Sequence, residues 1–150
     1  RGNGDGSFTT VSPDKSGVAL KGDARSLAAL DLNGDGRPDL ALARNDDTPV
    51  FLLLDPSALP EGHRHLRIHL QAPAGNPEAF GTRLTLSHAD GSTLALEPNA
   101  GGSYLSNSPA TLTVGIDPKN PPTLLRIRHP DGATSTLPIP EEEELVVPVP

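Results

Sequence analysis

The segment DLNGDGRPDL, Asp31 to Leu40, decides how the first part of this chain folds and what it binds. Oxygen-bearing side chains stand at loop positions one, three, five and nine, and glycines occupy positions four and six. Calcium takes about six to eight oxygen ligands, and glycine permits the positive φ angles that let a short loop wrap an ion. A backbone carbonyl at position seven could add another oxygen. The sequence therefore predicts a Ca²⁺ site formed by Asp31, Asn33, Asp35, the carbonyl of Arg37, and Asp39.

The spacing excludes an EF-hand, because position twelve is Leu42 and that motif needs a bidentate Glu there. The segments on either side, Ser26–Leu30 and Leu40–Ala43, are short apolar runs without helix caps, which is typical of buried strands. We therefore expect a loop between two strands. The alternative is an Asp/Asn/Gly turn that needs no metal.

This segment resembles the calcium loop of FG-GAP/VCBS repeats, which build integrin-type β-propellers. The segment RGNGDGSF, Arg1 to Phe8, resembles the end of one such repeat leading into the next. The resemblance implies that residues 1–55 hold the end of one repeat and one further repeat. We expect them to form a partial β-propeller blade with a calcium loop.

Composition limits the remaining classes. The 17 prolines argue against long helices. The lack of Cys excludes disulfides, thiolate metal sites and a Cys nucleophile. No apolar run is long enough to predict a membrane span. The net charge of −7, without a basic run, makes nucleic acid an unexpected partner. Because the chain has no Met, we expect it to be part of a longer protein.

The second part of the chain is expected to be a separate β domain. Pro56 and Pro60 mark residues 56–62 as a linker, so residues 63–150 form the second domain. In HLRIHLQ, residues 65–71, leucine and isoleucine alternate with polar residues, which predicts a strand with a buried face and an exposed polar face. Similar short runs follow, separated by turns. Together they predict an all-β fold with a small β-sandwich or barrel-like domain.

This part resembles the ASPIC/UnbV domain, which follows FG-GAP repeats in cartilage acidic protein-like exported proteins. The resemblance is carried by FGTRL (80–84), GSYLS (102–106), VGI (114–116) and RIRHPDG (126–132). Two departures stand out: Asn107 replaces the usual Gln, and His129 replaces the usual Trp. The resemblance assigns no functional role to individual residues.

We expect a non-catalytic, calcium-binding β module from the C-terminal part of a larger exported protein, extracellular or periplasmic. Its expected partner is a protein or glycan at a cell surface or matrix. One alternative is a carbohydrate-binding module, although three Phe, one Tyr and no Trp can hardly supply an aromatic platform. Another is a hydrolase fragment, although no carboxylate pair or nucleophile-elbow pattern is recognisable. We therefore expect no enzyme activity and no catalytic residues.

Three further expectations concern packing. The apolar run Pro49–Leu54 predicts a homodimer through the exposed blade edge, or a tight interdomain interface, centred on Leu52 and Leu54. Tyr104, the single Tyr, is expected to be buried beside Gly101 or Gly102. The run Glu141–Glu144 is expected to be a solvated turn or tail.

Overall fold

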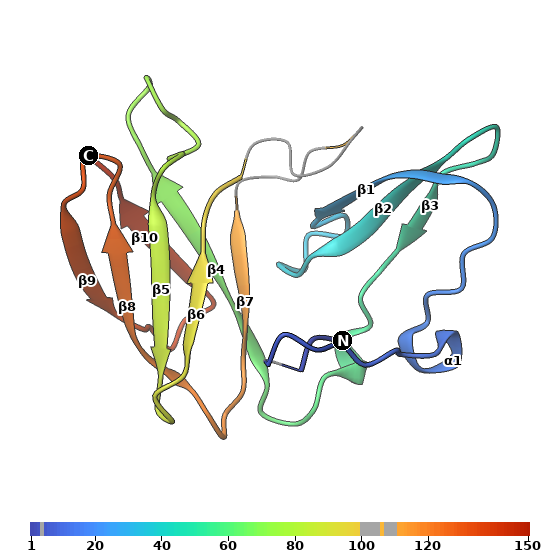
Figure 1. Cartoon of the computed structure of the whole chain (residues 1–150), viewed down its shortest axis with the longest axis horizontal. Coiled ribbons are helices and arrows are strands. Elements are labelled where there is room, and N and C mark those ends of the chain that lie inside the picture. The colour runs from blue at the N-terminus through green and yellow to red at the C-terminus, as the bar shows by residue number, and fades with distance from the viewer. Residues whose placement is uncertain (4, 100–105, 107–110) are drawn as a thin grey trace.

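The computed structural model describes residues 1–3, 5–99, 106 and 111–150. Within these ranges the chain forms ten strands, the four-residue helix α1 (Pro13–Ser16) and the short 3₁₀ helix η1 (Pro56–Ala58). The strands make three separate open sheets, and no closed barrel is present in the described ranges (Figure 1). The predicted all-β fold is confirmed. In the same ranges, no helix has the length and apolarity to cross a bilayer.

The first sheet contains the segments that flank the predicted calcium loop. Its antiparallel order is β1-β2-β3, and its strands are β1 (Ala24–Leu30), β2 (Asp39–Arg44) and β3 (Val50–Leu52). Leu30 pairs with Asp39, so the loop between β1 and β2 closes directly on the last pair of the ladder. The short apolar runs are therefore strands, as predicted. The assignment of this sheet to a propeller blade remains a prediction.

The second part of the chain forms two sheets. One has the order β10-β4-β7 and the other has the order β6-β5-β8-β9. β10 runs parallel to β4, and the other pairings are antiparallel. The strands are β4 (Arg64–Gln71), β5 (Arg83–His88), β6 (Thr93–Leu96), β7 (Leu112–Ile116), β8 (Pro122–Arg128), β9 (Thr134–Pro138) and β10 (Glu144–Pro148).

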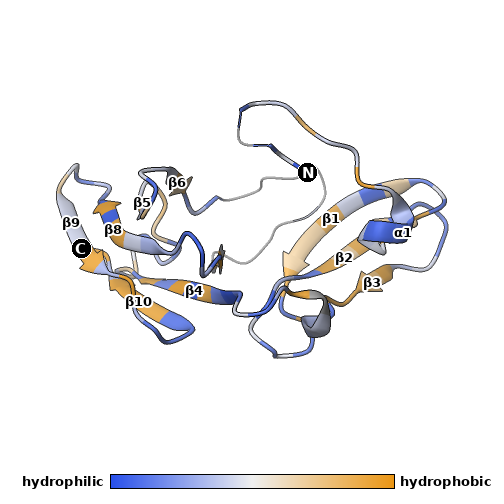
Figure 2. Cartoon of the chain, turned by 90° about the horizontal axis from the view of Figure 1, so that it is seen from below, coloured by the Kyte–Doolittle hydropathy of each residue, from blue (hydrophilic) through white to orange (hydrophobic). Residues whose placement is uncertain are grey.

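These two sheets enclose one hydrophobic core and so form a β-sandwich. The core takes alternate residues from strands of both sheets, because successive side chains of a strand point to opposite faces. Its most buried members are Leu66, Ile68, Leu84, Leu86, Leu125, Ile127 and Val147. Viewed from below, the two sheets appear as two layers, with apolar segments on β4, β8 and β10 (Figure 2). Fully burying one such side chain contributes about 1.5–3 kcal/mol.

Apolar side chains on and beside the edge strands are partly exposed. Leu94 is 39% exposed, because it lies on β6, an edge strand. Leu54, one centre of the expected dimer or interdomain interface, is 38% exposed and Leu52 is half-buried, and the interface stays a prediction. Tyr104, Gly101 and Gly102 lie outside the described residues.

Candidate functional site

The predicted calcium loop is wound around the carboxylate of its first residue. Asp31 Oδ1 accepts hydrogen bonds from the backbone N–H groups of Gly34 (2.7 Å) and Asp35 (3.1 Å). Asp31 Oδ2 accepts one from the N–H of Gly36 at 2.8 Å. Gly34 and Gly36 have φ angles of 75° and 85°, the left-handed region that favours glycine. The glycines therefore allow the turn that aims consecutive amides at one carboxylate.

Asn33 and Asp35 lie in the same hydrogen-bonded turn. Asn33 Oδ1 accepts from the Asp35 N–H at 3.1 Å, and Asn33 Nδ2 donates to Asp35 Oδ2 at 3.0 Å. Asp35 Oδ1 accepts from the backbone N–H of Arg37 at 2.9 Å. The Arg37 N–H, and next the Asn33 amide, lower the pKa of Asp35 below its ordinary value. The carboxylate of Asp35 is thus held in its charged form, which is the form that binds a cation.

Asp39 faces a different set of groups. It is 1% exposed, and its two carboxylate oxygens accept from the backbone N–H of Leu32 (3.0 Å) and of Leu54 (2.8 Å). Asp39 therefore fastens the start of the loop to the segment that leaves β3. A carboxylate has about four lone-pair sites, so these two bonds leave further lone pairs for a metal. In the described ranges, no three His, Cys, Asp or Glu side chains are grouped to hold a metal ion.

The donor set of the loop suits a hard cation. Asp31, Asn33 and Asp35 offer carboxylate and amide oxygens, the ligands that calcium prefers. Both oxygens of Asp31 are already used by hydrogen bonds, and the longest of these, at 3.5 Å, comes from Arg67 Nη1. A metal ion that binds Asp31 would most easily displace this contact. The loop would hold calcium through Asp31, Asn33 and Asp35, with Asp39 and the Arg37 carbonyl as the further predicted ligands.

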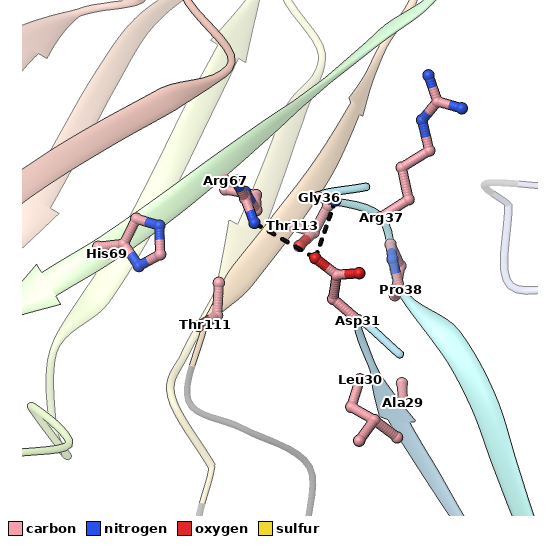
Figure 3. A pocket seen from close by; sticks show the side chains of 10 residues that line it. All are labelled: Ala29, Leu30, Asp31, Gly36, Arg37, Pro38, Arg67, His69, Thr111 and Thr113. Carbon is pink, nitrogen blue, oxygen red and sulfur yellow. Dashed lines mark hydrogen bonds and ion pairs between the residues drawn. The ribbon is translucent and has the colours of Figure 1, made fainter. Parts of the chain in front are cut away.

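The same loop packs against β4 of the β-sandwich. A Cβ atom added to Gly36 would lie 3.0 Å from His65 Nε2 and 3.2 Å from Arg67 Cζ, so the backbone of the loop directly contacts these side chains. Arg67 Nη1 lies 3.5 Å from Asp31 Oδ2 (Figure 3). Arg37 Nε donates to His65 Nδ1 at 3.5 Å. The loop thus joins the first sheet to the β-sandwich.

The run Glu141–Glu144 contacts the same β4 side chains that the loop contacts, His65 and Arg67. Arg67 forms an ion pair with Glu144, and His65 Nε2 lies 3.6 Å from Glu143 Oε2. All four glutamates of the run are exposed, as expected, but two of them are engaged with β4. Acidic side chains therefore flank Arg67 on both sides, one from the loop and one from β10.

A pocket of about 260 Å³ lies between the loop and the β-sandwich. The first sheet and its loop form one wall, while β4, β7 and the adjoining Thr111 form the other (Figure 3). Its lining residues are Ala29, Leu30, Asp31, Gly36, Arg37, Pro38, Arg67, His69, Thr111 and Thr113. The predicted metal loop is therefore also part of an interdomain cavity.

The polar face of β4 is less exposed than the sequence predicted. His65 was expected on an exposed face but is buried, and Arg67 and His69 are half-buried, because the loop covers them. His63 and His65 have separate acidic neighbours, since His63 Nε2 lies 3.7 Å from Asp117 while His65 approaches Glu143. Sequence reasoning missed His65 and Arg67 as site residues. The available signal was three polar side chains on one face of a strand that directly follows the linker.

Two protein-family models match different parts of the chain. Residues 1–42 match the FG-GAP-like repeat model, and residues 72–147, just over half of the chain, match the ASPIC and UnbV model. β4 lies before the second match but pairs with β7 and β10 inside it. No curated protein matches the chain. The chain therefore belongs to the ASPIC and UnbV family, and its ASPIC/UnbV domain follows an FG-GAP-like repeat.

Proposed function

We propose that this chain is a non-catalytic, calcium-binding β module of a larger exported protein that mediates protein or glycan interactions. The observation that carries the proposal is the position of the loop. Its oxygen-bearing turn, Asp31 to Asp35, is packed through Gly36 and Arg37 onto the β-sandwich. A calcium ion bound there would set the conformation of the loop and, through it, the contact between the two parts.

The match to an FG-GAP-like repeat supports the exported location in this proposal. FG-GAP-like repeats, matched here by residues 1–42, typically occur in extracellular or exported proteins. Calcium sites of extracellular modules bind with dissociation constants of about 10⁻⁴–10⁻³ M. A loop with few carboxylates, one of them shared with Arg67, suits such a weak site. We therefore place the chain in an extracellular or periplasmic compartment.

The environment of a Ser–His contact among the described residues disfavours a hydrolase. His129 Nε2 and Ser135 Oγ are 2.8 Å apart across the β8–β9 hairpin. A Ser nucleophile needs a base that is oriented by a third group. His129 Nδ1 is buried and has no hydrogen-bond partner among the described residues. We interpret the pair as a structural contact that steadies the hairpin.

An aromatic sugar platform is also disfavoured. The three phenylalanines are exposed but come from distant segments: Phe8 near the N-terminus, Phe51 on β3 and Phe80 in the loop before β5. Stacking on a sugar ring needs aromatic side chains gathered on one face. A glycan contact made by the described residues would therefore depend mainly on charge and hydrogen bonds.

Thermal melts with calcium and with a chelator test the proposal. At free calcium about one hundred times the dissociation constant, binding would add about 2.7 kcal/mol to the free energy of unfolding. We expect calcium to raise the Tm of the wild type and to have little effect on Asp35→Ala. Asp14→Ala, which removes an exposed carboxylate from α1, should keep the full calcium response. Identical wild-type curves with calcium and chelator would contradict the calcium site.

A further inference from the structure

The outer face of the β6-β5-β8-β9 sheet carries three arginines. Leu84 and Leu86 of β5, and Leu125 and Ile127 of β8, point into the core. The residues that alternate with them point outward. They place Arg83, Arg126 and Arg128 on the solvent face, and all three are exposed. We call these three residues the arginine face.

The strand register brings the three arginines close together. Arg83 of β5 pairs directly with Arg128 of β8, and Arg126 is two residues before Arg128 on the same strand. Neighbouring strands are about 4.8 Å apart, and residues two apart on one strand are separated by roughly 6.6 Å. Like charges directly opposite each other on a sheet are destabilising. This arrangement therefore has a cost in the isolated chain that an anionic partner would remove.

Little in the structure neutralises these charges. Arg83 forms one ion pair, Nη1 to Glu97 Oε1 at 3.0 Å, and both side chains are about half exposed. Ion pairs this exposed are weak and easily exchanged. Within the described ranges, no ion pair or side-chain hydrogen bond of Arg126 or Arg128 is present. The face is positive in a chain whose net charge is −7.

Hydroxyl groups surround the arginines. By register, Arg126 lies between Thr85 of β5 and Thr136 of β9, and Arg128 lies beside Thr134. Each hydroxyl can donate and accept hydrogen bonds. The surface therefore combines fixed cations with groups that pair with sugar hydroxyls.

We propose that the arginine face binds an acidic polysaccharide through its sulfate or carboxylate groups. Guanidinium groups bind such oxyanions with charge-assisted, often bidentate hydrogen bonds. The proposal deepens the proposed function by naming its surface and partner, and it does not require bound calcium. An acidic peptide fits less well, because peptide recognition usually adds apolar pockets or pairing with a strand edge. Nucleic acid fits less well because the chain as a whole is acidic.

Calorimetric titration of the full chain with dextran sulfate and with polygalacturonate tests the proposal. The informative variant is Arg126→Gln/Arg128→Gln. Both positions are exposed, so the variant should fold normally, with a Tm no lower than that of the wild type because the Arg83–Arg128 repulsion is removed. The matched control is Lys15→Gln/Lys119→Gln, which removes the same charge from exposed sites elsewhere. We expect at least one polysaccharide to bind the wild type and the control. We expect the arginine variant to bind about tenfold more weakly and with a shallower salt dependence.

The two probes separate sulfate from carboxylate recognition, and poly-L-glutamate separates polysaccharide from acidic peptide. Equal affinity of the arginine variant and the control would overturn the proposal, as would poly-L-glutamate binding as tightly as the better polysaccharide. Each titration is repeated with chelator. Loss of the calcium site alone would abolish the calcium shift in Tm and leave polysaccharide binding intact. If only the arginine face were wrong, calcium would still raise the Tm, but the arginine variant would bind polysaccharide as tightly as the control.

Discussion

The carboxylate of Asp31 and the guanidinium of Arg67 meet where the first sheet contacts the β-sandwich, with 3.5 Å between Oδ2 and Nη1. Arg67 also pairs with Glu144, so it has a second carboxylate to hold it. Asp31 is thus shared between the amides of its own loop and a guanidinium group of the β-sandwich. A metal ion and Arg67 would compete for the same oxygen.

Removing the positive charge of Arg67 should tighten calcium binding. We expect Arg67→Gln to raise calcium affinity several-fold. A partly exposed charge pair contributes up to about 1 kcal/mol, and its loss leaves Asp31 free for the metal. Arg64→Gln is the matched control, since Arg64 lies on the same strand but bonds the carbonyls of Glu142 and Pro140. Calorimetric calcium titrations measure both variants. Unchanged or weaker affinity in Arg67→Gln would argue against the competition.

Comparing alanine substitutions at Gly36 and Gly34 distinguishes the cost of backbone strain from the cost of disturbed interdomain packing. Both have positive φ, so Ala at either position should cost about 1–2 kcal/mol. Only Gly36 has neighbours within reach of a new Cβ, namely His65 and Arg67. We expect Gly36→Ala to destabilise the chain by about 1 kcal/mol more than Gly34→Ala. Urea unfolding in chelator measures the difference. Equal destabilisation would mean that His65 and Arg67 can move away from the new Cβ atom without loss of stability.

Asp39 should contribute to stability even without metal. Asp39→Ala removes the acceptor for the amides of Leu32 and Leu54, which should cost roughly 1–3 kcal/mol. Asp39→Asn keeps one side-chain oxygen and should cost less. Unfolding in chelator tests this metal-independent role. A wild-type stability for Asp39→Ala under these conditions would show that the two hydrogen bonds are dispensable.

The β5–β6 hairpin should respond to acid. The hydroxyl of Ser92, and then its backbone N–H, lower the pKa of Asp90 below the ordinary value of 3.8. The Asp90 carboxylate is therefore protonated at a higher pH in the unfolded chain than in the folded chain. The stabilisation is complete above the ordinary pKa and is lost as the pH falls through the lowered one. The stability difference between wild type and Asp90→Asn should shrink on acidification below about pH 4. Urea unfolding across this range would give a constant difference if the hydrogen bonds were unimportant.

The first sheet should drive any self-association. Phe51 and Leu53 are 59% and 60% exposed, more than the Leu52 and Leu54 that the sequence singled out. Exposed apolar edge strands invite pairing with another chain. We expect concentration-dependent dimers by light scattering, weakened in Phe51→Ser. Leu94→Ser, on the edge strand β6 of the sandwich, is the control. A wild-type monomer at all concentrations would refute the dimer.

The parts of the fold that local patterns control could be predicted from the sequence. Alternation placed Leu66 and Ile68 in the core, and the glycine-rich turn placed Asp31 and Asn33 in a loop between strands. The burial of His65 could not be predicted in this way. Alternation shows which side chains share a face, but the covering surface comes from a segment about thirty residues earlier in the chain. The parallel pairing of β10 with β4 is non-local in the same sense.

The most direct test of the account is a calcium titration followed by the backbone amide resonances of Gly34 and Gly36 in the loop and of His65 and Arg67 across the interface. We predict that both sets shift and that they report one dissociation constant, because the metal-binding loop is also the joint between the two parts. Loop resonances whose chemical shifts do not change with calcium would contradict the metal site. Shifts confined to the loop, with His65 and Arg67 unchanged, would contradict the link between calcium binding and the interdomain contact.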